Sequence, residues 1–235
     1  FRGTIFSRGR EALTNKKVSQ SQLLSSHHIT MLRNVSVLLA ILVSAEGFSV
    51  TPMKANRVVS STALNDAGLY YATSTGNTET IAGYIAAETG LEAEDIGDAD
   101  SDDITAKDAL IVGAPTWHTG AEEQRSGTPW DEWLYDTLPD LDLDGKKVAI
   151  FGVGDQQSYS DNFCDAAGEL YDKFTEKGCK VFGFTSQEGY DHVDSKAIRD
   201  GKFCGLMCDE DNQYDLSEER VKAWVAQLKS EGFMD

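Results

Sequence analysis

The sequence is poor in basic side chains: its 235 residues include 21 Lys and Arg against 39 Asp and Glu, a net charge of −18. The shortage is confined to one part of the chain. Residues 1–65 carry a net charge of +6, whereas residues 66–235 carry −24. So acidic a body argues against binding nucleic acid or anionic lipid, because both require Lys and Arg to meet phosphates. It favours partners with basic surfaces, which electrostatic steering brings in.

Several metal and nucleotide motifs are also missing. The chain has neither GxxxxGK[ST] nor GxGxxG, so the P-loop and the dinucleotide fingerprint are absent. No cysteine pair forms a CxxC, and no histidine stands at zinc-finger spacing. We therefore interpret the cysteines as buried small hydrophobic residues. They are Cys164, Cys179, Cys204 and Cys208.

The N-terminal part contains one short apolar segment, 35–43. Its nine residues are too few to span a bilayer core of about 30 Å as a helix. Basic residues precede it and small residues follow it, as in a signal peptide cleaved before Phe48. Residues 48–65 are rich in hydroxyls and contain bases but no acid, which is typical of a transit peptide. We expect a signal peptide over 31–47, a transit peptide over 48–65 and one folded domain over 66–235, and leave 1–30 unassigned as an extension or upstream sequence of a gene model.

From residue 68 onward, short apolar runs alternate with amphipathic stretches. The apolar runs predict strands over 68–72, 109–113, 147–153 and 180–185, and a weak edge strand over 91–96. Helical spacing predicts helices over 77–89, where Gly90 ends the helix, and near 129–138, 162–177 and 217–230. Apolar strands separated by helices indicate an α/β protein with helices on both faces of a parallel sheet. We interpret the long polar segment 186–214 as an insertion.

Three loops follow the first, third and fourth strands, and ligands of such sheets bind beyond the carboxyl ends of the strands. The first loop, 73–78, has four hydroxyls, no basic residue and a helix after it. Hydroxyls and N–H groups at a helix N-terminus can hold a phosphate without a cation. A hydroxyl-rich N-cap explains the same loop equally well. In the second loop, Trp117 is placed either to pack half-buried at the sheet edge or to lie flat on a planar ring.

In combination, the three loops resemble those of flavodoxins, small electron carriers that bind FMN. Segment 73–78 matches their phosphate loop, [T/S]-x-T-G-x-T, and segment 114–120 is similar to the loop that covers one flavin face. Segment 154–164 matches G-D-x-x-x-Y-x-x-x-F-C. The resemblance covers about residues 67–233, including the insertion of long-chain members, and is closest to algal members.

The resemblance implies a flavodoxin-like three-layer sandwich: a five-stranded parallel sheet of order 2-1-3-4-5, with an insertion associated with strand five. It implies that Trp117 and Tyr159 stack on the two flavin faces. It also implies that the His118–Thr119 peptide accepts a hydrogen bond from N5 of the reduced flavin. His118 departs from the Asn or Gly of many relatives, which leaves the ease of that peptide rotation open. The residues expected to contact FMN are Thr73, Ser74, Thr75, Gly76, Asn77, Thr78, Pro115, Thr116, Trp117, His118, Thr119, Gly120, Val153, Gly154, Asp155, Tyr159, Asn162, Phe163, Cys164 and Asp165.

The implied function is that of a low-potential one-electron carrier, because surrounding negative charge opposes the addition of an electron to the flavin. We find no general base, nucleophile or substrate pocket, and expect His192 to be solvated. The chain is therefore interpreted as an electron-transfer protein and not an enzyme. Two alternatives are an FMN-dependent NAD(P)H or quinone reductase, which needs an open flavin face, and a phosphoacceptor domain, which needs an Asp after the third strand.

The family implies photosystem I as electron donor and ferredoxin–NADP reductase as acceptor, with the protein replacing ferredoxin under iron limitation. We expect a monomer whose exposed acids, at 122–123, 191, 194 and 209–211, form a negative face for basic partners. The leader resembles the two-part presequence of algae with secondary plastids, such as diatoms, and so implies the plastid stroma. An ordinary N-terminal tail is the other interpretation of the leader.

Overall fold

The computed structural model describes residues 66–234. The predictions for 1–30, 31–47 and 48–65 concern a part of the chain that lies outside these residues. Within 66–234, each helix is too short or too polar to cross a membrane.

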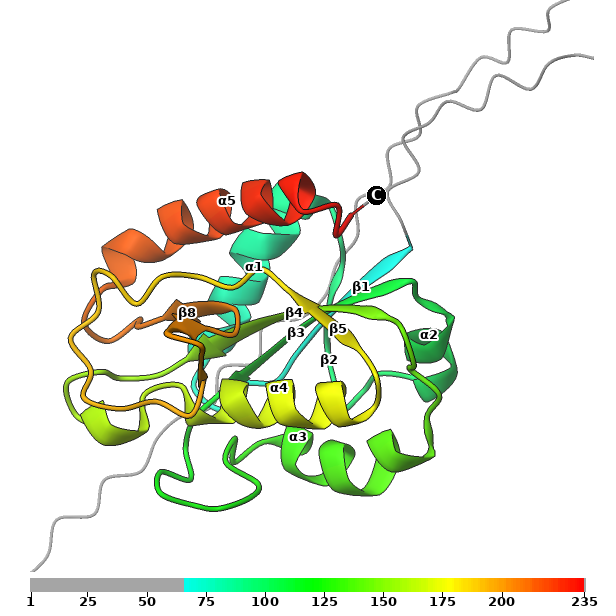
Figure 1. Cartoon of the computed structure of the whole chain (residues 1–235), viewed down its shortest axis with the longest axis horizontal. Helices are drawn as coiled ribbons and strands as arrows, with labels where there is room; N and C mark the ends of the chain where they lie inside the picture. The colour runs from blue at the N-terminus through cyan, green and yellow to red at the C-terminus, as the bar shows by residue number, and fades with distance from the viewer. Residues whose placement is uncertain (1–65, 235) are drawn as a thin grey trace, which may run out of the picture. The chain divides into compact units, whose positions relative to one another are not determined.

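Five parallel strands form the central sheet in the predicted order, β2-β1-β3-β4-β5 (Figure 1). Their bounds are Ala67–Tyr71 for β1, Ala93–Asp95 for β2, Ala109–Pro115 for β3, Lys147–Val153 for β4 and Lys180–Phe182 for β5. The chain moves outward from β1 to β2 and then crosses to β3 on the other side of β1. This reversal between β1 and β3 opens a crevice at the carboxyl ends of the strands, where ligands bind in doubly wound sheets.

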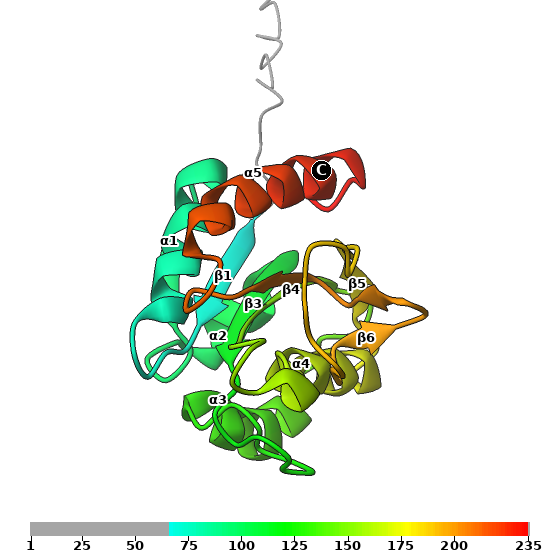
Figure 2. The same ribbon diagram turned by 90° about the vertical axis from the view of Figure 1, so that its left-hand side faces the viewer.

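The sheet is buried on both faces because consecutive strand residues point into two separate cores. In β3, Leu110 and Val112 belong to one core and Ile111 to the other. Helices α1 (Asn77–Thr89) and α5 (Tyr214–Ser230) pack on the side of Ile111 (Figure 2). Helix α4 (Asp165–Glu176) and the segment 129–140 cover the opposite face. Burial on both faces explains why the strands are apolar at nearly every position.

The fifth strand is split in two, and the strand predicted over 180–185 ends at residue 182. Gly183 has a φ of +78°, and a Cβ there would lie 2.5 Å from the indole nitrogen of Trp224, so the chain turns away from the sheet. Strand β8 (Leu206–Cys208) then pairs in parallel with the second half of β4. The chain therefore leaves the sheet after the short strand β5 and returns as β8, a sixth strand that continues alongside β4.

The insertion carries a hairpin formed by β6 (Ile198–Arg199) and β7 (Lys202–Phe203). The turn between them is Asp200-Gly201, and both residues have positive φ, +50° and +78°. Asp-Gly is a favoured pair for a two-residue hairpin turn of this kind. The turn signal is present in the sequence, but two-residue strands are too short to show a periodic pattern.

The helical predictions needed three corrections. The predicted helix 129–138 is composite: α3 (Pro129–Glu132) continues as a π-helical turn over Trp133–Thr137 and a 3-10 turn over Leu138–Asp140. The predicted helix 162–177 is α4 preceded by a 3-10 turn over Ser160–Asn162. A further helix, α2 (Ser101–Ala106), was not expected; Asp100 caps it by accepting the Asp102 N–H at 2.8 Å.

Candidate functional site

A cleft of about 440 Å³ lies at the carboxyl ends of β1, β3 and β4. Ten of its twelve lining residues are among those expected to contact a ligand, and Ser158 and Asp211 are additions. The ten are Thr75, Asn77, Pro115, Thr116, Trp117, Thr119, Val153, Gly154, Asp155 and Tyr159. Three loops far apart in sequence thus converge on one cleft. A second hollow, of about 450 Å³, lies along β1 and β2 and draws on none of these loops.

The first loop, 73–78, leads into the N-terminus of α1 and carries a hydroxyl that has no hydrogen-bond partner among the described residues. Gly76 adopts a φ of +93°, and its N–H donates to Thr73 Oγ1 at 2.9 Å. No side chain caps the helix, so the hydroxyls do not serve as its N-cap. The Thr78 side chain is 1% exposed, and its hydroxyl has no hydrogen-bond partner within the described part of the chain. Because a buried unpaired hydroxyl costs about 1–3 kcal/mol, this site fits a ligand that supplies an acceptor.

Two aromatic side chains of the cleft are open to solvent. Trp117 is 48% exposed and Tyr159 is 51% exposed, and both line the same cleft. Trp117 is thus half-buried at the sheet edge, and about half of its surface is left open where it lines the cleft. A planar ligand placed against these rings would remove apolar surface from water and gain stacking energy.

The third loop is ordered by the carboxylate of Asp155. This carboxylate accepts hydrogen bonds from the N–H groups of Gln157 and Ser158, at 3.0 and 2.8 Å. Burial opposes ionisation, but these bonds and one from Asn212 outweigh it and lower the pKa of Asp155. Asp155 therefore keeps a negative charge in the cleft wall. A Cβ on Gly154 would lie 2.9 Å from the Cys164 nitrogen, so only glycine allows this close approach.

Ten of the predicted contact residues do not line the cleft. Phe163 and Cys164 are fully buried, and the Asp165 carboxylate binds the Lys196 N–H at 2.8 Å and the Asn162 amide at 3.2 Å. These residues lie behind the third loop and join it to the insertion. The others outside the lining are Thr73, Ser74, Gly76, Thr78, His118 and Gly120.

All four cysteines are free and buried, which confirms their interpretation as small hydrophobic residues. Burial raises the pKa of Cys208 to about 12, and burial also raises the pKa of Cys204 to about 12. These thiols remain protonated at neutral pH and are poor nucleophiles.

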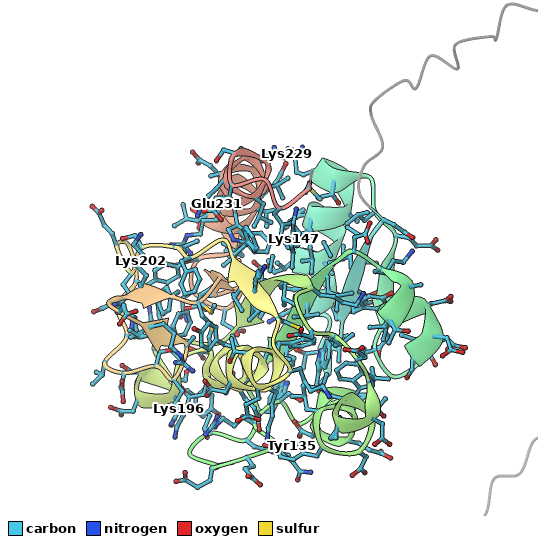
Figure 3. The ribbon with its side chains drawn as sticks, turned by 45° about the vertical axis from the view of Figure 1, so that its right-hand side comes forward. Tyr135, Lys147, Lys196, Lys202, Lys229 and Glu231 are labelled. Carbon is cyan, nitrogen blue, oxygen red and sulfur yellow. The ribbon has the colours of Figure 1, made fainter. Side chains whose placement is uncertain are left out.

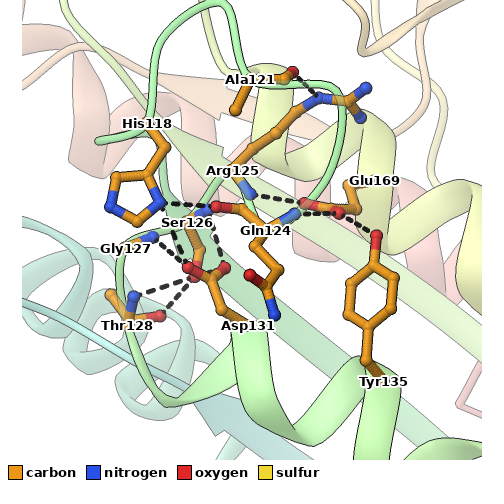
Figure 4. Close-up of polar contacts among 10 residues, drawn as sticks. All are labelled: His118, Ala121, Gln124, Arg125, Ser126, Gly127, Thr128, Asp131, Tyr135 and Glu169. Atoms are coloured by element: carbon orange, nitrogen blue, oxygen red, sulfur yellow. Dashed lines mark hydrogen bonds and ion pairs between the residues drawn. The ribbon is translucent and has the colours of Figure 1, made fainter.

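The second loop continues beyond Gly120 to residue 128, where α3 follows, and it is folded around its own backbone (Figure 4). The Arg125 carbonyl accepts hydrogen bonds from the N–H groups of Trp117 and His118, at 3.1 and 3.0 Å. His118 Nδ1 lies 2.6 Å from the Gln124 carbonyl oxygen and 3.5 Å from an Asp131 carboxylate oxygen. The His118 ring is therefore engaged by its surroundings, and the His118 carbonyl, which was expected to accept a hydrogen bond from N5 of the flavin, accepts one from the Ala121 N–H at 3.1 Å in this structure.

Buried carboxylates are the functional features that sequence reasoning missed. Asp209 was expected on the exposed acidic face, and this was wrong, because its side chain is completely buried. It accepts hydrogen bonds from the Gln156 N–H at 3.1 Å, the Gln156 side-chain amide at 2.8 Å and the Asn212 N–H at 3.0 Å. It thereby ties β8 to the third loop. Glu169 is also buried; it lies four residues after Asp165 in α4, a spacing of two like charges that is unfavourable on a helix surface.

His192 was predicted to be solvated, but it is only partly exposed. Its ring lies against Phe163 and Phe203, with ring centroids 5.4 and 5.2 Å apart. Burial lowers the pKa of His192, despite the opposing effect of Asp194 and Asp191. The imidazole is part of the packing of the insertion against the third loop.

The fold and the cleft together define a class of protein. The sheet is parallel, the helix after the hydroxyl loop has an uncapped N-terminus, and two exposed aromatics line the same cleft. Such a protein binds a planar ligand that carries a phosphate, with the ring at the aromatics and the phosphate at the helix.

Comparisons with known proteins name that class. The flavodoxin family model matches residues 69–224. The flavodoxin of Nostoc sp. is 48% identical over 167 residues, covering 70% of this chain and 95% of the relative. That of Synechococcus elongatus is 49% identical over 168 residues, covering 70% and 96%. The crystal structure of Fusobacterium nucleatum flavodoxin bound to flavin mononucleotide superposes with a TM-score of 0.63 at 32% identity, covering 70% of this chain and 97% of that one. The chain belongs to the flavodoxin family.

Proposed function

We propose that the protein is an electron carrier that binds FMN non-covalently in the cleft of loops 73–78, 116–120 and 153–159. The observation that carries the proposal is the combination of two half-exposed aromatics in the cleft with the buried, unpartnered hydroxyl of Thr78, the residue that follows Asn77 of the cleft lining. When bound, the flavin supplies the redox chemistry, because it takes up and releases electrons one at a time. The residues of the chain bind it, orient it and set its surroundings.

The phosphate site uses dipoles and hydroxyls in place of a cation. The first N–H groups of α1 point along the helix axis towards the loop and carry its positive end of the dipole. Thr75 lines the cleft and Thr78 lies at the second position of the helix. Lys and Arg are absent from the twelve residues that line the cleft. The phosphate therefore keeps its negative charge close to the ring.

The cleft combines aromatic side chains, which would cover the flavin ring, with acidic side chains. Trp117 and Tyr159 exclude water from the ring, and two carboxylates, Asp155 and Asp211, line the same cleft. Negative charge held near the flavin in a medium of low dielectric constant opposes the addition of electrons. We therefore infer a low reduction potential and a strong one-electron donor.

The distribution of charge supports docking with the cleft foremost. Lys147 begins β4 and Lys229 lies in the last turn of α5; Figure 3 brings this side forward and labels both, together with Glu231. Lys147 donates to the Gly232 carbonyl at 2.6 Å and Lys229 to the Glu88 carbonyl at 3.3 Å, at or just beyond helix C-termini. Acids lie at that end as well, such as Asp66, which pairs with Lys107 at 2.6 Å. The acids of the cleft, Asp155 and Asp211, would therefore be what steers a basic partner towards the flavin.

The acids at the cleft support redox partners with basic faces. From the family resemblance we propose photosystem I as donor and ferredoxin–NADP reductase as acceptor, with the carrier replacing ferredoxin when iron is scarce. We propose that it acts as a monomer in the plastid stroma, to which the basic leader addresses it. Its acidic body is not suited to nucleic acid or to anionic membranes.

The test is to express the full chain, record its absorption spectrum and titrate the apoprotein with FMN. We expect a yellow protein that, when added to photosystem I particles and ferredoxin–NADP reductase in the light, supports NADP⁺ reduction. Failure to take up FMN would refute the cofactor assignment. Oxidation of NADPH by the pure protein alone would instead support the reductase alternative, and FMN uptake without electron transfer would refute the named partners.

A further inference from the structure

A buried carboxylate reaches from helix α4 into the second loop. Glu169 lies in the second turn of α4 and is only 3% exposed, which is rare for a glutamate unless its oxygens are paired. Its Oε1 accepts hydrogen bonds from the Gln124 N–H at 2.7 Å and from the Tyr135 hydroxyl at 2.6 Å (Figure 4). Its Oε2 accepts one from the Arg125 N–H at 2.8 Å. Two of these three donors are consecutive backbone groups of the loop.

The loop backbone is shaped to receive this anion. Gln124 has a φ of +56°, a left-handed conformation that is unfavourable for a residue with a side chain. In such a turn, consecutive N–H groups can converge on one side and form a site for an anion. The Glu169 carboxylate binds both N–H groups and so compensates the cost of the turn.

The same two loop residues hold the backbone next to the cleft. The Arg125 carbonyl accepts the N–H groups of both Trp117 and His118, and the Gln124 carbonyl contacts His118 Nδ1. Each residue therefore uses its N–H group on Glu169 and its carbonyl on segment 117–118. A chain of hydrogen bonds runs from α4, through one residue of the loop, to the backbone of Trp117.

Helix α4 is joined to both walls of the cleft. It begins directly after the third loop, which carries Tyr159, and its Ala166 N–H donates to Thr116 Oγ1 of the second loop at 3.0 Å. Asp131 supports the other half of the second loop, at Ser126 and Gly127, but it belongs to α3, which directly follows that loop. Glu169 instead fixes the loop relative to an element 44 residues away in sequence.

We propose that Glu169 is a positioning residue of the flavin site: through Gln124 and Arg125 it sets the place of Trp117 opposite Tyr159. The inference rests on the proposed FMN function. Glu169 does not line the cleft, so it acts on the ligand through the loop and not by contact.

The binding test compares FMN with riboflavin, which lacks the phosphate, in variants of the full chain. Glu169→Gln keeps one oxygen but turns an amide group towards a backbone N–H, and Glu169→Ala removes both acceptors. We expect both variants to bind FMN and riboflavin about tenfold more weakly or worse, by the same factor for the two ligands. Thr78→Val, which acts on the phosphate side, is expected to weaken FMN alone.

Two matched controls isolate the loop contacts. Glu176→Gln removes one negative charge from the same helix at an exposed position, where the carboxylate meets only Lys173 at 3.9 Å. Tyr135→Phe removes the third hydrogen bond of Glu169 but leaves both loop N–H groups paired. Both controls are expected to bind the two flavins as the unmodified chain does.

A readout without flavin completes the test. Hydrogen–deuterium exchange of the apoprotein should become about tenfold faster or more over 116–128 in Glu169→Ala, while α1 and β3 keep their protection. Unchanged exchange and affinity, loss of FMN binding with riboflavin binding retained, or loss of protection throughout the sheet would each overturn the proposal. If the unmodified chain binds neither flavin, the proposed function fails, and the exchange measurement alone decides whether Glu169 holds the loop.

Discussion

Replacement of Thr78 by valine should change the stability of the apoprotein and the affinity for FMN in opposite directions. Valine keeps the branched shape of threonine and exchanges the hydroxyl for a methyl group. The Thr78 side chain is 1% exposed, and its hydroxyl has no partner among residues 66–234. Because burial of an unpaired hydroxyl costs about 1–3 kcal/mol, the substitution is expected to stabilise the apoprotein by about 1 kcal/mol.

The same substitution removes a donor for the phosphate. A hydrogen bond to a charged acceptor contributes about 1.5–3 kcal/mol, which corresponds to a factor of about 10–150 in the dissociation constant of FMN. Riboflavin has no phosphate, so its affinity should not change. A variant that is more stable when empty and binds its ligand less well is difficult to obtain by general damage to the fold.

The assays are urea unfolding of the apoprotein and fluorescence titration with each flavin. Thr80→Val is the matched control, since the Thr80 hydroxyl is exposed and already donates to the Gly76 carbonyl at 3.0 Å. It is therefore not a buried donor without a partner. The control should change neither quantity appreciably. A Thr78→Val apoprotein that is less stable, or an FMN affinity equal to that of the unmodified chain, would refute the assignment of this hydroxyl to the phosphate.

Three further predictions concern the aromatic side chains of the cleft, a buried carboxylate and a buried tyrosine of β1. Trp117→Ala and Tyr159→Ala should each weaken FMN binding about fivefold, which is equivalent to about 1 kcal/mol of stacking. Both should also raise the reduction potential by admitting water. Titration and potentiometry measure these effects, and an unchanged affinity in both variants would contradict stacking. Asp209→Asn should lower the free energy of unfolding in urea by about 2 kcal/mol, because an amide group then faces the donors of Gln156; an unchanged urea midpoint would contradict this. Burial, and after it nearby acids, raises the pKa of Tyr70 to about 12, so the unfolded chain loses this proton at lower pH than the folded one. Stability should therefore fall as pH rises from 10 to 12, and Tyr70→Phe should reduce that fall in unfolding measured across this range.

Much of the fold could be predicted because its strongest signals are local. Strands β1, β3 and β4 are continuous apolar runs, and a strand buried on both faces needs apolar residues at successive positions. Gly90 ends α1 with a φ of +77°, as its position predicted. The end of β5 at Gly183 was not predictable, because the turn there depends on Trp224, whose indole N–H binds the Gly183 carbonyl from 41 residues away.

The candidate site also has a part that could be predicted from the sequence and a part that could not. The hydroxyl loop and the two aromatics follow strand ends, so the topology of a parallel sheet is enough to bring them to one edge. The acidic residues behaved differently: Asp155 lines the cleft, whereas Asp209 and Glu169 are buried supports. An acidic side chain is exposed unless donors surround it, and those donors come from other loops.

The sequence by itself determined the order of the elements, the two buried faces of the sheet and the loops at its carboxyl edge, because each depends on neighbouring residues and on the geometry of strands. Only the tertiary structure decided which polar groups are paired. Glu169 finds its donors in a loop 44 residues away and Asp209 in one 53 residues away, while Thr78 is buried without any within the described residues. Hydrogen bonding of buried groups depends on contacts between distant segments, and no pattern of neighbouring residues specifies those contacts.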